Sequence, residues 1–323
     1  MKKENDAAPM KSNSSSASIK LGYKLYATNF SKIFRTSWFT ALIYAIICSC
    51  LGTLSLQSIT KISMIAQTSP NQALTYLQQN IGFIILAFVL FVLGGLCELT
   101  FYSCGLSQLY HHKTEGNMNT STRWYHINKS ILWRTIKAAL VNLLFIFIAC
   151  CISLMVFSVC IRYHMANYTT TGLTVIIAII LGLLLLPFIY ISFRYILNPE
   201  TKIWTLIFHQ YKIGLKHLGY IFAVALFSGI ILIITQNILT LPTTILGLAS
   251  CQSSMGVAEG DPLNMPSYAT LLTIILLLIS GFIQIYVRLS IFFPFYYMTG
   301  SIDTQEQERK QYQEETNRES QQY

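Results

Sequence analysis

Charged side chains are scarce in this sequence. Only 11% of its 323 residues are charged, whereas 53% are hydrophobic. Soluble domains carry roughly a quarter charged residues, because water must solvate their surface. A chain of this length could bury one large core or two smaller ones, but so few charges could not cover its outside. The composition therefore excludes an ordinary soluble protein and predicts that lipid surrounds part of the chain.

Local signatures of catalysis are also missing. The sequence has no HExxH, no GxSxG around a serine, no Walker-type phosphate loop and no CxxC pair. Its six histidines lie outside the cores of the apolar runs, and the adjacent His111 and His112 would point in different directions on a helix. We therefore predict that the chain is not an enzyme and has no catalytic residue, no cofactor and no metal.

Six apolar segments are each long enough to cross a bilayer. A membrane helix needs about 20 mostly apolar residues, and runs such as VIIAIILGLLLLPFIYISF lack the period of two that a membrane strand would show. A backbone surrounded by lipid must also satisfy its own hydrogen bonds, as a helix does. We predict an all-α polytopic membrane helix bundle of about six transmembrane helices. The predicted spans are residues 38–56, 81–106, 138–161, 172–193, 218–240 and 268–297.

Lysine and arginine are distributed unevenly around these spans. Nineteen of the 22 lie in the two terminal segments and in the second and fourth connections with their helix edges, whereas only Lys61 and Arg162 lie on the opposite side. Short loops rich in these residues stay in the cytoplasm. We therefore predict a cell-membrane protein with both termini cytoplasmic. Its basic excess would face the anionic lipids of the inner leaflet, which attract each base by about 1 kcal/mol, and nucleic-acid binding is not expected.

The two ends of the chain are polar. The first contains KSNSSSAS, and the second contains the run QEQERKQYQEE, neither of which offers an apolar stripe for packing. We predict a disordered cytoplasmic tail over residues 1–20, a six-span transmembrane domain over residues 21–300 and a solvated polar cytoplasmic tail over residues 301–323.

A basic, aromatic segment precedes each outward-running span. The three segments are KLGYKLYATNFSKIFRTSW, RWYHINKSILWRTIK and TKIWTLIFHQYKIGLKHLG. Such a segment can lie in the headgroup plane, with its apolar face in lipid and its bases outward. The pattern fits three repeated units, each an interfacial helix followed by a helical hairpin. The alternative is that any cytoplasmic flank gathers bases and aromatic residues at the membrane surface.

The third of these segments also carries a family resemblance. In FRYILNPETKIWTLIFHQYKIGLKHLG, residues 193–219, the end of one span leads through Asn-Pro into an amphipathic helix and the next span. With the six-span layout, the chain resembles bacterial six-span integral membrane proteins of unassigned function, related to the membrane domain of some glycerophosphoryl diester phosphodiesterases. The resemblance implies a bacterial inner-membrane protein and carries over no functional residues. The soluble parts are too short to hold the phosphodiesterase catalytic domain.

Two ionisable residues, Glu98 and Arg288, lie well inside predicted spans. Such groups cost a few kcal/mol each in a membrane, so a specific reason for them is expected. Glu98 lies 17 residues after Ile81, and Arg288 lies 17 residues after Leu271. Both are therefore about 25 Å along helices that run inward. Their equal depth predicts that Glu98 and Arg288 can form an ion pair.

Two further residues complete a candidate intramembrane polar cluster. Arg194, near the inner end of the fourth span, is the competing partner for Glu98, and Gln284 shares a helical face with Arg288. The cluster is either a structural ion pair that fixes helix packing or a site for a solute or a proton. We favour the structural interpretation, because only one acidic group is buried and proton pumps usually need relays.

The other polar or reactive side chains of the spans are predicted to have structural roles. Asn142, Gln236 and Asn237 are expected to make hydrogen bonds between helices, worth about 0.6–2 kcal/mol each. Six of the eight cysteines lie in apolar runs, where cysteine acts as a small hydrophobe. Only Cys160 and Cys251 could meet at the outer face, so no disulfide framework is expected.

Two functions remain compatible with the sequence. The first is a non-catalytic membrane protein that organises lipid or a membrane protein partner through basic interfacial helices. The second is a small-solute or ion transporter or channel whose path includes Glu98 and Arg288. We prefer the first, because basic aromatic segments are abundant and because transporters usually have more broken helices and more polar spans.

Overall fold

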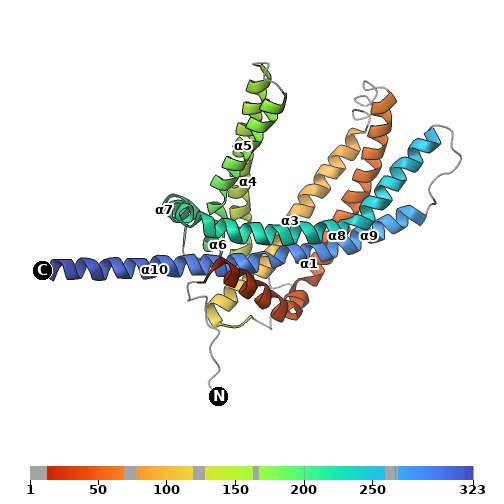
Figure 1. Ribbon diagram of the computed structural model, residues 1–323. Helices are drawn as coiled ribbons and strands as arrows, with labels where there is room; N and C mark the ends of the chain where they lie inside the picture. The colour runs from red at the N-terminus through yellow and green to blue at the C-terminus, as the bar shows by residue number, and fades with distance from the viewer. Residues whose placement is uncertain are drawn as a thin grey trace. The chain divides into compact units, whose positions relative to one another are not determined.

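The computed structural model describes residues 13–68, 78, 80–118, 128–162, 167–199, 201–258, 266 and 268–322. Helices dominate these residues (Figure 1). Their bounds are α1 Ser15–Thr68, α3 Ile81–Glu115, α4 Lys129–Arg162, α5 Asn167–Leu185, α6 Pro187–Leu197, α7 Ile203–Lys216, α8 Leu218–Ala258, α9 Tyr268–Ser290 and α10 Phe292–Gln322.

The predicted all-α fold with six membrane-length helical stretches is confirmed. The stretches that are long and apolar enough to cross a membrane are Ser15–Ser55, Ile81–Glu115, Lys129–Arg162, Tyr168–Leu197, Leu218–Ser250 and Tyr268–Arg318. Each contains most or all of one predicted span, and all six continue beyond it at one end or both. The fourth stretch combines α5 and α6, which are separated at Pro187, a residue without an N–H to donate.

The chain divides into two compact units, and several helices pass from one into the other. Unit 1 comprises Met1–Ile33, Ser103–Ile230 and Ser290–Tyr323, and unit 2 comprises Phe34–Tyr102 and Ile231–Leu289. The boundary between α9 and α10 coincides with a unit boundary. Pro294 cannot donate to the carbonyl four residues earlier, at Ser290, which accounts for the break there.

Small residues on α1 organise the packing of unit 2. Ala41, Ala45 and Ser49 follow at four-residue intervals and are almost completely buried. Ser49 donates its hydroxyl to the carbonyl oxygen of Ile274 in α9 at 2.9 Å, and a Cβ on Gly281 would lie 3.6 Å from the Cα of Ala45. Small side chains let membrane helices approach this closely, and van der Waals contact then holds them together.

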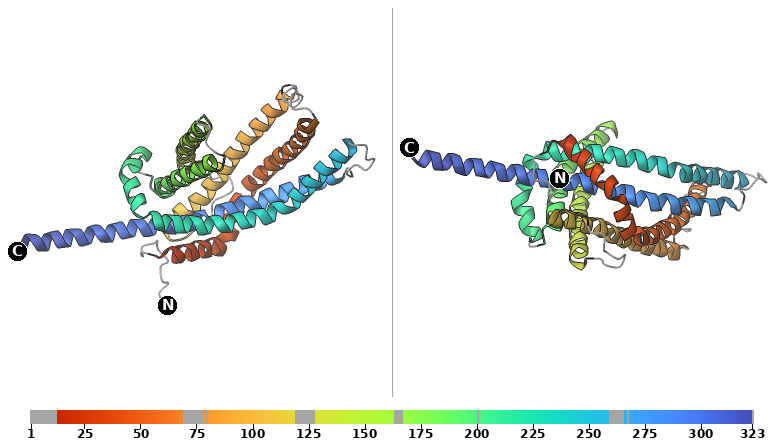
Figure 2. Two further views of the ribbon diagram at one scale, coloured as in Figure 1. Left: turned by 45° about the horizontal axis from the view of Figure 1, so that its top comes forward. Right: turned by 90° about the horizontal axis from the view of Figure 1, so that it is seen from below.

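The first turns of α10 form the centre of unit 1. Phe293, Tyr296, Met298 and Ile302 are each at most 1% exposed. Beyond them the helix leaves the packed region, and residues 307–318 are all exposed. Figures 1 and 2 show this part of α10 extending alone toward the C-terminus. Both figures also show α4 and α5 lying side by side as a hairpin of the same unit.

The beginning of α1 packs closely against α10 in unit 1. Ser18 is fully buried and its hydroxyl lies 2.6 Å from that of Tyr220 in α8. A Cβ on Gly22 would lie 2.6 Å from the Cα of Pro294 and 2.7 Å from the carbonyl carbon of Phe293. These are backbone atoms, so the two helices touch where the side chain is missing.

Both predicted tail boundaries need correction. The disordered tail expected over residues 1–20 is wrong for residues 15–20, because α1 begins at Ser15 and small residues, rather than apolar ones, pack its first turns. Residues 1–12 lie outside the described residues. The solvated tail expected from residue 301 begins later, because Ser301 and Ile302 are buried and Asp303 and Glu306 form ion pairs.

Of the three predicted interfacial segments, the third forms a separate helix, α7. The first is continuous with the span that follows it, as the start of α1. The second is described from Asn128 onward, and there α4 begins at Lys129 and continues to Arg162 without a break. Residues 123–127 of this segment lie outside the described residues.

The predicted structural roles of the other polar side chains are confirmed in part. Asn142 in α4 donates to the hydroxyl of Ser192 in α6 at 2.9 Å, an interhelical hydrogen bond as predicted. Asn237 instead donates to the carbonyl of Ile233 in its own helix. Cys160, one of the two cysteines that could have met at the outer face, is a buried free thiol.

Candidate functional site

Glu98 of α3 and Arg288 of α9 form an ion pair in unit 2. Nη1 of Arg288 lies 3.0 Å from Oε1 of Glu98 and 3.1 Å from the hydroxyl oxygen of Tyr44. Tyr102, one turn along α3, donates its hydroxyl to the same carboxylate oxygen at 2.5 Å. The predicted pair is confirmed, and Tyr44 is a member of the cluster that sequence reasoning missed.

The other two residues predicted for this cluster have different partners. Gln284 donates its amide to the hydroxyl of Ser280 on its own helix at 2.9 Å. Arg194 belongs to unit 1, where its carboxylate partner is Asp303 at 2.8 Å. Glu98 therefore pairs with Arg288, whereas Arg194, its predicted competing partner, pairs with Asp303.

Arg194 is the centre of a second polar network, in unit 1. Its Nη1 contacts the hydroxyl of Tyr190 at 2.6 Å, Oε1 of Gln210 at 2.9 Å and Oδ1 of Asp303 at 2.8 Å. Tyr190 donates to the same oxygen of Asp303 at 2.6 Å. The network therefore ties α6 to both α7 and α10, through charge-assisted hydrogen bonds, which are the strong ones.

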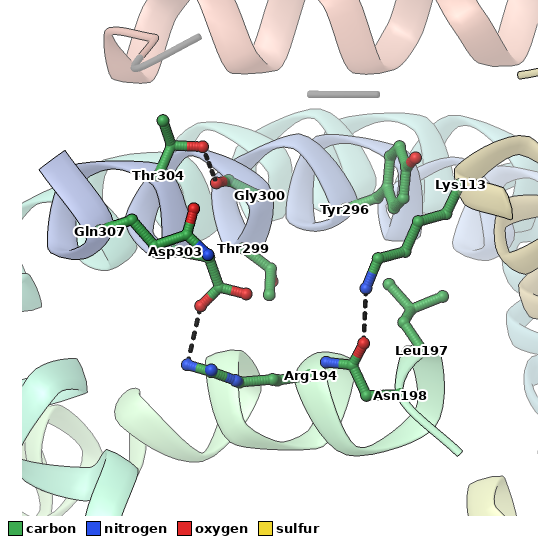
Figure 3. Close-up of a pocket in the computed structure, with 10 residues that line it drawn as sticks. All are labelled: Lys113, Arg194, Leu197, Asn198, Tyr296, Thr299, Gly300, Asp303, Thr304 and Gln307. Atoms are coloured by element: carbon green, nitrogen blue, oxygen red, sulfur yellow. Dashed lines mark hydrogen bonds and ion pairs between the residues drawn. The ribbon is translucent and has the colours of Figure 1, made fainter. Parts of the chain in front are cut away.

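A polar cavity of about 340 Å³ lies next to this network, between α6 and α10. Figure 3 shows Arg194 reaching from α6 toward Asp303, while Lys113 reaches from α3 toward Asn198. The Lys113 ammonium donates to Oδ1 of Asn198 at 2.6 Å. The sequence gives no sign of this cavity, because Lys113 lies among the bases that predict the orientation and Asp303 lies in the predicted polar tail.

Arg134, also first interpreted as an orienting base, holds the end of α6. Its guanidinium donates to four backbone carbonyls, those of Tyr195 at 2.5 Å, of Asn198 and Pro199, and of Thr201 at 2.8 Å. Its central carbon lies 4.5 Å from the centroid of the Tyr195 ring. The last carbonyls of a helix lack partners within it, and a cation there is favourable. Arg134 thus fixes the connection that leads into α7.

We expect Arg134→Lys to destabilise the protein by about 1.5–3 kcal/mol. A lysine keeps the charge, but it cannot present a planar fork of donors to several carbonyls at once. Thermal unfolding in detergent measures the effect. Arg162→Lys is the matched control, because Arg162 is an exposed residue at the other end of α4. Equal melting temperatures for the Arg134→Lys variant and the wild type would show that the four-carbonyl contact has no stabilising role.

α7 has three faces rather than the two of an ordinary amphipathic helix. Successive residues are about 100° apart, so residues spaced by three or four lie on one face. The face toward the protein holds Leu206, Ile207 and Gly214. A second face, the aromatic stripe, holds the exposed Trp204, Phe208 and Leu215 and the half-buried Tyr211. A third face, the basic stripe, holds the exposed Thr205, His209, Lys212 and Lys216.

The aromatic stripe borders an apolar groove of about 480 Å³ between α7 and the α4–α5 hairpin. Phe145 and Phe188 line it with ring centroids 4.3 Å apart. Tyr211 also lines it and donates its hydroxyl to the carbonyl of Leu184 at 2.9 Å. Partial burial raises the pKa of this hydroxyl. A Cβ on Gly214 would lie 2.7 Å from Cβ of Pro187, so α7 lies directly against α6.

The histidines of the described residues have separate partners. His112 lies 3.2 Å from the hydroxyl of Tyr296, His217 lies 3.0 Å from Glu306, and His111 lies 3.4 Å from Glu115. Among the described residues, no three histidine, cysteine or acidic side chains gather in a way that could hold a metal ion.

The fold and these sites define the class of the protein. Six long apolar helices, with large hydrophobic side chains exposed along them, make the chain a multi-pass membrane protein. No protein-family model matches the chain, and no curated protein or solved structure matches it either. The resemblance to the bacterial six-span proteins therefore stays a prediction.

Proposed function

We propose that the chain is a non-catalytic protein of a cell membrane that organises anionic lipid at the inner leaflet, with both termini in the cytoplasm. The observation that carries this proposal is the surface of α7, where an exposed aromatic stripe runs beside an exposed basic stripe. The orientation is supported by the uneven distribution of lysine and arginine along the sequence.

The two stripes of α7 match the two layers of a membrane surface. Trp204 and Phe208 are 55% and 77% exposed, which is costly in water and favourable at the boundary between headgroups and acyl chains. Lys212 lies on the basic stripe, beside the aromatic stripe, where it can contact the phosphate groups of the lipid headgroups. Each such base contributes about 1 kcal/mol of attraction to an anionic surface.

The apolar groove supports the same role. It is lined almost entirely by apolar side chains of α4, α5, α6 and α7, and it begins at the aromatic stripe. Lys202 precedes α7 directly, and Lys212 follows the groove residue Tyr211 in the chain. An acyl chain in the groove would therefore have a base available for its headgroup at either of two places along the helix. The groove thus offers a lipid a place for both its chain and its charge.

Two alternatives receive less support. A membrane protein partner could cover the same aromatic stripe, but the basic stripe beside it favours an anionic lipid. For a transporter or channel, the charges of Glu98 and Arg288 would have to be available to a solute. They are instead neutralised by each other and bonded to Tyr44 and Tyr102, which supports the structural interpretation. Kinship with the bacterial six-span proteins remains part of the proposal.

The test is the lipid selectivity of the reconstituted protein. Spin-labelled phosphatidylglycerol and spin-labelled phosphatidylcholine are compared for the fraction of motionally restricted lipid around the protein in phosphatidylcholine vesicles. The wild type should select the anionic lipid. Lys202→Gln/Lys212→Gln should reduce that selectivity about fivefold for each effective contact of about 1 kcal/mol.

Arg309→Gln/Lys310→Gln is the matched control for this experiment. It removes the same charge from the exposed part of α10, so it should leave the selectivity unchanged. The proposal fails if the wild type shows no preference for phosphatidylglycerol, or if both double variants lose it equally.

A further inference from the structure

The polar cavity between α6 and α10 has an excess of positive charge. Among the described residues that line it, Lys113 and Arg194 are cations and Asp303 is the carboxylate. Arg194 and Asp303 neutralise each other across 2.8 Å. The cavity therefore keeps one uncompensated positive charge, that of Lys113.

The ammonium of Lys113 is held by a neutral acceptor, and Asp303, the carboxylate that acts on it electrostatically, is already paired with Arg194. The hydrogen-bond acceptor of Lys113 is the neutral side-chain oxygen of Asn198 at 2.6 Å. Among the described residues, no carboxylate lies within 4.0 Å of this ammonium. An ammonium has three donors, so two remain for a ligand. Keeping a half-buried cation without an anionic partner is costly, unless an anion completes the site.

The shape of the cavity places this charge where a ligand could reach it. Lys113 and Arg194 come from different helices, α3 and α6, and extend into the same space beside α10 (Figure 3). Gln307 of α10 also lines the cavity, and its amide can donate hydrogen bonds. Three helices of unit 1, α3, α6 and α10, thus place hydrogen-bond donors around the same cavity.

We propose that this cavity binds a singly charged phosphoryl group, which accepts hydrogen bonds from Lys113 and the neighbouring donors. Its volume of about 340 Å³ accommodates such a group. A ligand with a single negative charge would make the site neutral. A dianion would instead leave it with one excess negative charge. The phosphodiester of a lipid headgroup and free monobasic phosphate share this chemistry. The site uses no residue of α7 and goes beyond the proposed function.

The experiment measures stabilisation of the full-length protein in detergent by two probes. Inorganic phosphate and a short-chain phosphatidylglycerol are each titrated at constant ionic strength, with chloride as the reference, and the midpoint of thermal unfolding is recorded. The wild type should be stabilised in a saturable way by at least one probe. Lys113→Gln should weaken binding at least tenfold, while Lys129→Gln, which removes an exposed lysine at the start of α4, should not.

Two features keep this test decisive. If Lys113→Gln fails to fold, ³¹P line broadening of phosphate by the wild type is compared with that by Lys113→Arg, which keeps the charge and should keep binding. A response to phosphate assigns the site to free phosphate, and a response to phosphatidylglycerol alone assigns it to a headgroup. Stabilisation that chloride reproduces, the absence of a response to both probes, or undiminished binding by Lys113→Gln overturns the proposal.

Discussion

Gly22→Leu should abolish most of the folded protein. The helix backbone at Gly22 lies so close to α10 that even a Cβ would come within 2.6 Å of the Cα of Pro294. Backbone atoms inside helices cannot move aside as the end of a flexible side chain can. One extra methyl group in a tight core typically costs about 1–3 kcal/mol, and a leucine adds a larger volume. Total stabilities of about 5–15 kcal/mol leave little margin for such a loss.

The measurement is the yield of monodisperse protein after solubilisation, followed by thermal unfolding of what is recovered. Gly22→Ala should be intermediate between the wild type and Gly22→Leu. Gly219→Leu is the matched control, because Gly219 also lies in a helix of unit 1 but has no neighbouring atom within 4 Å of the position that a Cβ would occupy. Wild-type yield and stability for Gly22→Leu would mean that α1 does not contact α10 there.

The contact at Gly22 also shows what apolar periodicity alone does not reveal. Prediction of the first helix relied on apolar periodicity, which is absent before residue 20. The packing there depends on small residues instead, since Ser18 and Gly22 let α1 approach α8 and α10. Their spacing of four residues was a usable signal, because small residues at this interval favour close helix contacts in membranes. Composition alone makes the same segment look disordered.

The spans themselves were predictable because contact with lipid is a local property. In α3, Phe83, Phe88 and Phe91 are all more than half exposed, and a side chain that faces lipid must be apolar whatever the rest of the chain does. The ends of the helices were less predictable. There α10 leaves the apolar run at about residue 297 and continues as a polar helix, so hydropathy underestimates its length.

The two ion pairs also differ in how far the sequence predicts them. Glu98 and Arg288 could be paired from sequence, because depth along two helices can be counted. The Arg194–Asp303 pair could not, because the two residues are 109 positions apart and Asp303 follows the end of the apolar run. Only the packing of α10 against α6 brings its carboxylate to Arg194. Partners that are far apart in the sequence and lie near helix ends can therefore be identified only from the structure.

Removing either charge of the Glu98–Arg288 pair should destabilise unit 2 by about 3 kcal/mol. Breaking a buried pair by removing one partner typically costs about 3–5 kcal/mol, because the remaining charge is left uncompensated. The lower end applies here, since about a quarter of each side chain is exposed, 26% for Glu98 and 28% for Arg288. Thermal and denaturant unfolding in detergent of Glu98→Gln and Arg288→Gln measure this cost.

The double variant Glu98→Gln/Arg288→Gln should be less damaged than the sum of the two single variants, because no charge is then left without a partner. A charge swap, Glu98→Arg/Arg288→Glu, should recover only part of the stability, since Tyr102 loses the carboxylate to which it donates. Glu115→Gln is the control, because Glu115 is 59% exposed and its contact with His111 lies at the surface. If the single variants fold as stably as the wild type, the pair does not fix helix packing. The two charges would then be available to a solute or proton, and flux measurements in proteoliposomes would decide between these functions.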